Sequence, residues 1–347
     1  MRKKWLWRTL AVIAGLVVVT VLVFTVSPWP SALIIRQVFQ DGAKKTAAIM
    51  APYAPTSGVD SVLDVQYATD STQPHVKASG FTQLDVFYPT GTTTQLGTVI
   101  WTHGGAWISG NKSNDRSYFE ILASKGYTVV GLNYTYGPEA TYPTAVFELN
   151  QAHQFLLDNA EKFHIDPSKI VLAGDSAGAQ LSSQLAALIT NPDFAKEMDF
   201  TPALSPEQLQ GVVLNCGVYQ LTSLIGAKGI LGWGDDVSLW AYTGDRDITT
   251  SPAMAQMSTI NHVTGNFPAT YISGGNADPL TAENSKPFAA KLQSLGVNVT
   301  ELFWPADYTP PLPHEYQFKL NLDAAQNALT ETLAFLNERI GSNKPNK

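Results

Sequence analysis

The sequence has little of what several large classes of protein need. It contains a single cysteine, Cys216, so no disulfide can form within the chain. This residue follows an apolar run, and we expect a buried, unreactive thiol there. No group of histidine, cysteine and acidic residues has metal-ligand spacing, and no glycine-rich phosphate loop or dinucleotide fingerprint occurs. The sequence therefore predicts neither a bound metal nor a cofactor.

Positive charge is also scarce. The 347 residues carry 22 Lys and Arg against 29 Asp and Glu, a net charge of −7, and no basic run occurs outside the extreme N-terminus. Binding to nucleic acid depends on clustered Lys and Arg, so we expect no nucleic acid partner. With 44% hydrophobic and 15% charged residues, the composition is that of a globular protein with a large buried core.

Charged residues are missing altogether from 9–35. Residues 2–8 carry four positive charges, and 9–26 is almost wholly apolar. Eighteen helical residues span about 27 Å, close to the thickness of the hydrocarbon core of a bilayer. Three tryptophans stand where interfacial aromatic residues are found: Trp5, Trp7 and Trp29. Pro28 and Pro30 are expected to end the helix, and the segment is predicted to be an uncleaved transmembrane anchor.

A cleavable signal peptide is the rival interpretation of this segment. Its apolar region is usually shorter, about 7–15 residues, and is followed by a small-residue cleavage site that this chain lacks. Four positive charges precede the span, and only Arg36 follows within ten residues of it. Because positive residues stay in the cytoplasm, this bias predicts a cytoplasmic N-terminus and an extracytoplasmic body. Residues 1–35 are then a cytoplasmic stub and single-pass anchor in the cell membrane, whereas cleavage would give a secreted protein.

After the anchor the pattern of the chain changes twice. Residues 36–80 are mixed, with a helix expected near 38–50 and a strand over 62–69, and we interpret them as a stalk and an N-terminal elaboration. From 81 to 340, buried strands alternate with helices, which predicts one α/β domain with a mostly parallel sheet and helices on both faces. The expected strands are 83–88, 98–102, 127–134, 170–173, 212–215, 269–273 and 297–303, and the expected helices are 117–125, 144–162, 176–189, 283–295 and 321–340.

Two segments depart from this alternation. Residues 217–262 are rich in glycine and aromatic residues, and we expect them to form a small cap-like insertion over the carboxyl ends of the strands, where ligands bind in such sheets. Residues 341–347 (GSNKPNK) are expected to form a disordered tail.

One junction between strand and helix has a special form. The apolar run 170–173 leads into GDSAG at 174–178, and small, helix-compatible residues follow. A G-x-S-x-G turn in this setting is so tight that a side chain at either flank would collide with the neighbouring backbone. It leaves Ser176 in a strained conformation at the apex, with the first helical amides, notably that of Ala177, aimed at whatever reacts with the serine. The pattern predicts a nucleophile elbow.

A serine nucleophile needs a base within hydrogen-bond reach, and the base needs a carboxylate that orients it. In open α/β sheets that carry such an elbow, the order along the chain is serine, acid, histidine. Of six histidines, only His314 follows every candidate acid, in a proline-rich loop before the last helix. Asp278 follows the predicted strand 269–273 and is the expected partner of His314 Nδ1. Its rivals are Asp245, Asp247 and Asp307.

Attack on a carbonyl also needs donors for the developing oxyanion. The first long buried strand ends in THGGAW at 102–107, and consecutive glycines let a backbone turn its N–H groups toward the site. Gly104 and Gly105 are the predicted donors, together with Ala177. His103 is expected to hold this loop by hydrogen bonds rather than to act as the base.

Together these residues resemble the α/β-hydrolase superfamily and, within it, the hormone-sensitive-lipase-like carboxylesterases. The loop at 103–107 resembles the HGGG-x-x oxyanion motif of that family, and 174–178 resembles its GDSAG elbow. Further similar segments are NY at 133–134, GPE at 137–139, YP at 142–143 and DP at 166–167. The resemblance covers roughly 81–340 and leaves out the anchor. Ala106 stands where the family has a third glycine, and Ala179 stands where many relatives have one.

The resemblance implies an α/β-hydrolase fold and metal-free cleavage of carboxylic esters through an acyl-enzyme. The catalytic domain is then 81–340, with Ser176, Asp278 and His314 as the triad and His103, Ala106 and Asp175 in supporting positions. We therefore predict a serine carboxylesterase for short- to medium-chain or aryl esters. The alternatives are an amide-cleaving relative, a formamidase or small peptidase, and a non-catalytic adhesion or scaffold protein on the same fold. The natural substrate and the oligomeric state are left open.

Overall fold

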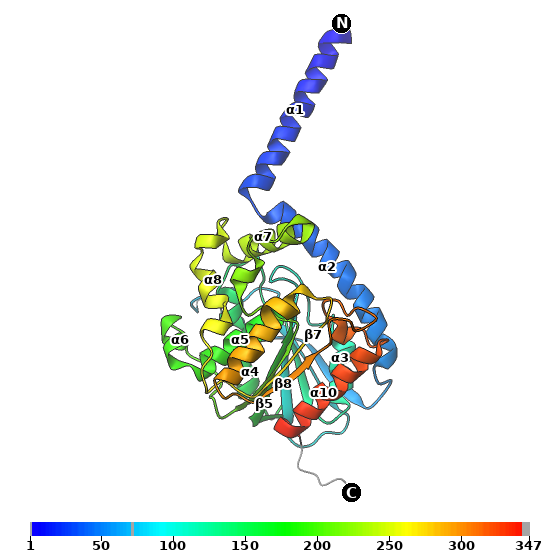
Figure 1. The fold of residues 1–347 in the computed structure, drawn as a ribbon, viewed down its shortest axis with the longest axis vertical. Coiled ribbons are helices and arrows are strands. Elements are labelled where there is room, and N and C mark those ends of the chain that lie inside the picture. Colours follow the sequence, from blue (N-terminus) through cyan, green and yellow to red (C-terminus); the bar gives the residue numbers. More distant parts are fainter. Residues whose placement is uncertain (1, 71–72, 342–347) are drawn as a thin grey trace.

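The computed structural model describes residues 2–70 and 73–341 (Figure 1). Apart from Gly341, the expected tail at 341–347 lies outside the described residues. Eight strands form one sheet in the order β1-β2-β4-β3-β5-β6-β7-β8. Their bounds are β1 Val59–Gln66, β2 Gln83–Pro89, β3 Leu96–Thr102, β4 Thr128–Leu132, β5 Ile165–Asp175, β6 Leu209–Asn215, β7 Thr270–Gly274 and β8 Val299–Phe303.

The sheet is mostly parallel, as predicted. The pairs β1–β2 and β2–β4 are antiparallel, and every pair from β4 to β8 is parallel. The strand expected at 62–69 is present as β1, starting three residues earlier, and its antiparallel edge position explains its mixed pattern of burial.

Ten α-helices accompany the sheet in the described chain. They are α1 Arg2–Val26, α2 Trp29–Met50, α3 Arg116–Ala123, α4 Thr144–Asp158, α5 Ser176–Thr190, α6 Pro192–Glu197, α7 Gly229–Thr243, α8 Pro252–Met257, α9 Lys286–Ser294 and α10 Asp323–Ile340. The sheet packs on both faces because its side chains alternate: Ile100 joins the core under α4, α5 and α9, whereas its neighbours Val99 and Trp101 join the core under α3 and α10. The predicted α/β architecture is therefore confirmed.

The apolar N-terminal segment forms α1, which projects away from the rest of the chain (Figure 1). Residues 5–26 of this helix are long and apolar enough to cross a membrane, and its most apolar stretch is not covered by the protein. The expectation that both prolines end the helix is only half right. The helix does end before Pro28, but Pro30 lies in the first turn of α2, where a residue without an N–H is tolerated.

Helix α2 begins at Trp29, well before the helix expected near 38–50, and it lies along the body in contact with α3 and α7. Arg36 fastens it there. The guanidinium donates to the carbonyls of Ile108 at 2.7 Å and Gly137 at 3.0 Å. It also forms a bidentate ion pair with Glu139. Helix α7 lies within the expected insertion at 217–262. It packs on α2 at the end of the body from which α1 projects (Figure 1).

Candidate active site

The predicted elbow joins β5 to α5 with no intervening residue. Ser176, the first residue of α5, has φ +51°, the left-handed region that costs a residue with a side chain about 1 kcal/mol or more. A Cβ atom at Gly174 would lie 2.5 Å from the carbonyl carbon of Gly178. At Gly178 a Cβ atom would overlap the carbonyl oxygen of Thr102 on the neighbouring strand. The turn therefore requires glycine at both flanks and exposes the hydroxyl of Ser176 at its apex.

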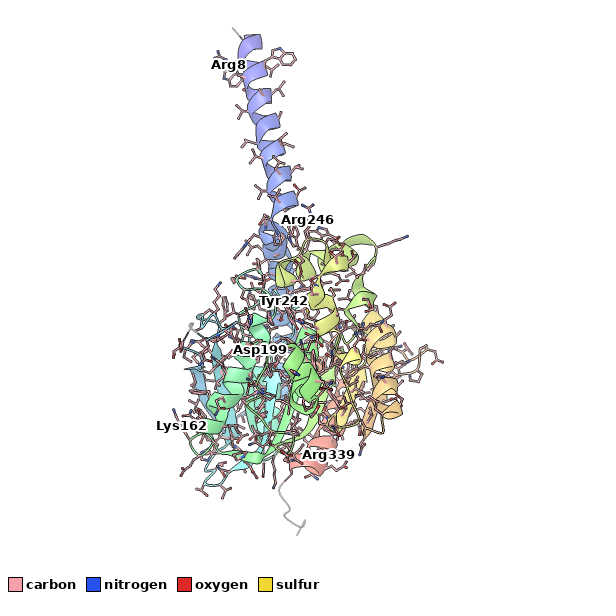
Figure 2. All side chains as sticks on the ribbon, turned by 90° about the vertical axis from the view of Figure 1, so that its left-hand side faces the viewer. Arg8, Lys162, Asp199, Tyr242, Arg246 and Arg339 are labelled. Carbon is pink, nitrogen blue, oxygen red and sulfur yellow. The ribbon has the colours of Figure 1, made fainter. Side chains whose placement is uncertain are left out.

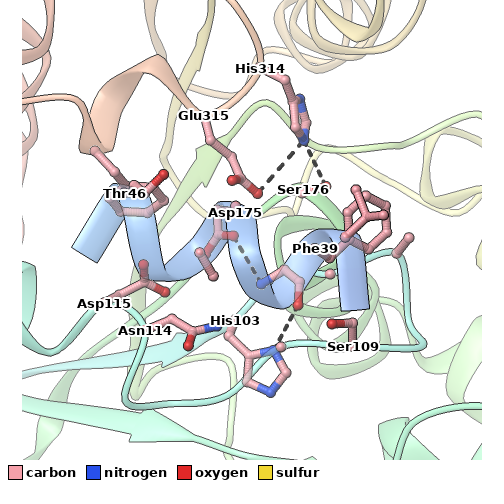
Figure 3. A pocket seen from close by; sticks show the side chains of 18 of the residues that line it. Phe39, Thr46, His103, Ser109, Asn114, Asp115, Asp175, Ser176, His314 and Glu315 are labelled. Carbon is pink, nitrogen blue, oxygen red and sulfur yellow. Dashed lines mark hydrogen bonds and ion pairs between the residues drawn. The ribbon is translucent and has the colours of Figure 1, made fainter. Parts of the chain in front are cut away.

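The structure brings Ser176, His314 and Asp278 together from three separate elements. His314 Nε2 lies 2.9 Å from Ser176 Oγ (Figure 3). On the other side of the ring, His314 Nδ1 lies 2.8 Å from Asp278 Oδ2. A carboxylate only accepts, so Nδ1 carries the proton and Nε2 is left to accept from the serine hydroxyl. The amide of Leu280 donates to the other oxygen of Asp278 at 3.0 Å and fixes the carboxylate in the turn after β7. The rivals Asp245 and Asp247 accept from residues of their own loop instead.

The surroundings of His314 favour its charged form. Burial lowers the pKa of the imidazole, whereas the hydrogen bond and the charge of Asp278 raise it, and the pKa of His314 lies well above its usual range. Burial raises the pKa of the Cys216 thiol to about 11, so this thiol is uncharged at neutral pH. Asp278 is therefore the anion that stabilises the imidazolium. Cys216, Asp278 and His314 also form a cluster of potential metal ligands among the described residues, but two of the three already bind each other.

The glycine loop after β3 corrects one prediction. The amide of Gly104 donates to Asp175 Oδ2 at 2.9 Å, so Gly104 is not available as an oxyanion donor. The next two amides, of Gly105 and Ala106, have no hydrogen-bond partner within the described chain. Both residues have positive φ, +110° and +50°, which turns their peptide planes away from the course of β3. The first turn of α5 adds the amide of Ala177.

Asp175 and His103 hold this loop in place. The buried carboxylate of Asp175 accepts from Trp101 Nε1 at 2.8 Å as well as from Gly104, and burial together with the charge of Glu315 raises its pKa to about 7. His103 donates from Nδ1 to the carbonyl of Gly104 at 2.7 Å and stacks on Tyr134. Burial lowers the pKa of His103 to about 4, so the ring is neutral and donates from Nδ1 only.

A pocket of about 380 Å³ lies in front of Ser176. Its walls come from the elbow, the glycine loop, the segment after His314 and, on one side, α2 (Figure 3). The residues of α2 in this wall are Val38, Phe39, Gly42, Ala43 and Thr46. The sequence pattern missed this wall, because 36–80 was interpreted as a stalk and an elaboration rather than as part of the site.

Two further acids that the sequence analysis missed line the same pocket. Glu315 Oε1 lies 3.8 Å from His314 Nε2, and Glu315 holds a left-handed backbone with φ +56° (Figure 3). Asp115 is nearly fully buried, and burial together with the charge of Asp175 raises its pKa well above the usual range. The only sequence signal for Glu315 was its position directly after His314. Nothing near Asp115 in the sequence marked it.

Comparison with known proteins agrees with this architecture. Three similar solved structures are esterase B from Lactobacillus rhamnosis, a hyperthermophilic esterase from the archaeon Pyrobaculum calidifontis and a bacterial heroin esterase. Esterase B is 21% identical with a TM-score of 0.74, and the match covers 89% of this chain and 95% of that one. The archaeal esterase is 20% identical with a TM-score of 0.68, covering 88% and 91%. The heroin esterase is 19% identical with a TM-score of 0.66, covering 88% and 91%.

Likeness at this level of identity shows a shared fold. The family is shown by a separate match, in which residues 84–292, more than half of the chain, fit the BD-FAE family. The matched residues run from β2 to α9 and include the glycine loop, the elbow and Asp278. The chain therefore belongs to the BD-FAE family, a hormone-sensitive-lipase-like family of α/β-hydrolases.

Proposed function

We propose that this protein is a serine carboxylesterase. One observation carries the proposal: the hydroxyl of Ser176 lies 2.9 Å from an imidazole nitrogen whose other nitrogen lies 2.8 Å from a buried carboxylate. That arrangement converts a weak alcohol nucleophile into a reactive one. The three structural neighbours are esterases, which supports the same reaction class.

In the proposed mechanism, Ser176 Oγ attacks the ester carbonyl carbon while His314 Nε2 takes the hydroxyl proton. Asp278 stabilises the imidazolium that forms. His314 then returns the proton to the leaving alcohol, which gives an acyl-enzyme on Ser176. Water, deprotonated by His314, attacks the acyl carbon and releases the carboxylic acid and the free serine.

The amides of Gly105, Ala106 and Ala177 are the proposed donors to the oxyanion. Each such donor typically contributes about 100- to 1000-fold in rate, so the fixed position of the loop matters. Asp175 and His103 provide it from two sides, by holding the amide and the carbonyl of Gly104. Asp175 and His103 are positioning residues in this scheme.

We also propose that α1 anchors the protein as a single-pass helix with its N-terminus in the cytoplasm and the catalytic domain, 81–340, outside. Four positive charges before the span and its unbroken apolar length support this orientation. Intact-mass measurement of protein purified from membranes tests whether α1 is retained as the anchor. A product that begins after residue 26 would instead assign α1 as a signal peptide.

The function is tested by labelling the full-length protein, in mild detergent, with a fluorophosphonate probe. We expect labelling of the wild type and none of Ser176→Ala, and absence of labelling in the folded wild type would contradict the mechanism and favour a scaffold role. An aryl ester and its matching anilide then separate the two hydrolase types. A faster reaction with the ester supports an esterase, whereas equal or faster cleavage of the anilide would favour a formamidase or small peptidase.

A further inference from the structure

Exposed apolar side chains gather at one end of the body. Outside α1, ten large apolar side chains of the described residues are exposed, and eight of them lie on α2 and the first turns of α7: Trp29, Leu33, Ile34, Val38, Phe39, Ile230, Leu231 and Trp233. Ile230 and Leu231 are 80% and 72% exposed, values typical of residues with no protein partner. Concentrated exposure of this kind marks an interaction surface.

This surface lies where α1 joins the body. Only Ser27 and Pro28 separate α1 from α2, and α7 packs on the first half of α2 through a small apolar cluster that includes Ile35 and Val237. The start of α2 and α7 therefore lie at the end from which α1 projects (Figure 1). Arg246, which is exposed, lies at the same end of the body (Figure 2). Exposed aromatic and aliphatic residues at such a position suit the headgroup layer of a membrane.

The same helix leads from this surface to the catalytic pocket. Trp29 and Phe39 are ten residues apart, about 15 Å along a helix axis. Val38 and Phe39 line the pocket in front of Ser176, whereas Leu33 and Ile34 face away from the body and remain exposed. One wall of the pocket is thus the continuation of a helix whose start lies at the membrane end of the protein.

We propose that a docking face, formed by Leu33, Ile34, Ile230, Leu231 and Trp233, rests in the headgroup layer of the membrane that holds α1. The pocket then receives esters that reside in that lipid layer. This inference rests on the proposed esterase function and names its substrate class: acyl esters of membrane lipids or of amphiphiles dissolved among them.

The connection to α1 is the reason that we expect lipid to cover the docking face. A membrane-spanning α1 brings the start of α2 to the bilayer boundary, because the 22-residue span 5–26 of α1 extends about 33 Å and the hydrocarbon core is about 30 Å thick. Apolar side chains at that depth are covered by lipid without any further partner. A second copy of the chain is the rival occupant, and the experiment distinguishes the two.

The docking face is tested with a polarity-sensitive fluorophore on the full-length protein in nanodiscs of phosphatidylcholine and phosphatidylglycerol. The fluorophore is attached to Leu231→Cys, or to Leu63→Cys as the matched control, since Leu63 is an exposed apolar residue on β1. The native Cys216 is fully buried and does not compete for the label. We expect a nitroxide-labelled lipid to quench the probe at 231 at least about three-fold more than the probe at 63.

Equal, weak quenching at the two positions would overturn the docking proposal. Emission from position 231 that changes with protein concentration in detergent, and not with the lipid quencher, would assign the face to a second copy and also overturn it. Hydrolysis of p-nitrophenyl butyrate is measured on the same samples. If that soluble ester is not cleaved, the proposed function fails. If it is cleaved and position 231 is unquenched, the docking face alone fails.

The substrate class is tested with 1-oleoylglycerol dissolved in the nanodiscs. The triple variant Ile230→Gln, Leu231→Gln and Trp233→Gln is expected to release oleate at least about ten-fold more slowly than the wild type. Its rate with p-nitrophenyl butyrate is expected to stay within about two-fold of the wild type, because none of the three residues lines the pocket. Leu63→Gln serves as the control and is expected to change neither rate. An equal loss of rate with both substrates, or no loss of rate with either, would contradict the proposal.

Discussion

Arg36 is the residue whose replacement most sharply tests how α2 is held against the site. Its guanidinium donates to two buried carbonyls, of Ile108 and Gly137, and to both oxygens of Glu139, and it lies 4.6 Å from the ring centroid of Tyr136. The Ile108 carbonyl belongs to the chain just after the proposed oxyanion loop. Arg36→Met removes all of these contacts and keeps a side chain of similar length.

The expected loss of stability follows from the groups that Arg36→Met leaves without a partner. Two buried carbonyls lose a charged donor, which costs about 1–3 kcal/mol each, and the one-fifth-exposed Glu139 loses its partner, which costs less because water reaches it. We expect a loss of about 3–5 kcal/mol, in the range found when one member of a buried ion pair is removed. A domain of this size is stabilised by about 5–15 kcal/mol, so the body stays folded while α2 loosens.

The assay combines limited proteolysis between α1 and β1 with the kinetics of a soluble aryl ester. Arg36→Met is expected to be cut faster in α2 and to lose about 10- to 100-fold in kcat/KM, since a pocket wall and the support of the glycine loop are both affected. Arg36→Lys keeps the positive charge but lacks the planar guanidinium. We expect its rate of proteolysis and its kcat/KM to lie between those of the wild type and Arg36→Met. Lys44→Met changes an exposed α2 cation whose nearest acid, Asp41, is 3.6 Å away, and should behave as wild type. Unchanged proteolysis and kcat/KM in Arg36→Met would refute the reasoning.

Three further predictions concern the site itself. Asp278→Asn should lower kcat about 10⁴-fold, because an amide facing Nδ1 favours the tautomer that cannot accept from Ser176; a loss under about ten-fold in steady-state kinetics would point to another acid. Because the reaction needs neutral His314 and its pKa is raised above 6.5, kcat/KM should increase with pH through a midpoint above that value, and a flat profile between about pH 5 and 8 would contradict this. Ala106→Gly should raise the free energy of unfolding in urea by about 0.5–1 kcal/mol, since it relieves a left-handed alanine, and lowered stability would show that the methyl group packs usefully.

Local pattern predicted the parts of this protein that depend on neighbours in sequence. Buried strands such as β3 and β4 stand within two residues of their expected bounds, because apolar runs flanked by turns are sufficient to define them. The elbow was equally accessible, since its shape is imposed by glycine at 174 and 178. The order serine, acid, histidine led to Asp278 and His314, which the structure brings together with Ser176; their roles remain predictions until they are tested.

The errors arose where a distant partner decides the outcome. Gly104 carries a suitable amide, but Asp175, 71 residues later, occupies it, and no spacing rule shows that contact. Arg36 entered the sequence analysis only as a charge that follows the apolar span, and nothing there indicated its ion pair with Glu139, 103 residues away. The wall that α2 contributes to the pocket was missed for the same reason, because a helix far from the catalytic motifs gives no sign of where it packs.

The buried thiol beneath the triad has a practical consequence. Cys216 is the sole cysteine of the chain, it is fully buried beside His314, and its backbone φ is +44°. A thiol reagent added to the untouched protein can react only during moments when the carboxyl ends of the central strands separate from the loops above them. The rate at which Cys216 reacts therefore measures how often this part of the structure opens. Comparing this rate with the rate at which activity is lost on warming shows whether the enzyme is inactivated by local opening or by unfolding of the whole domain.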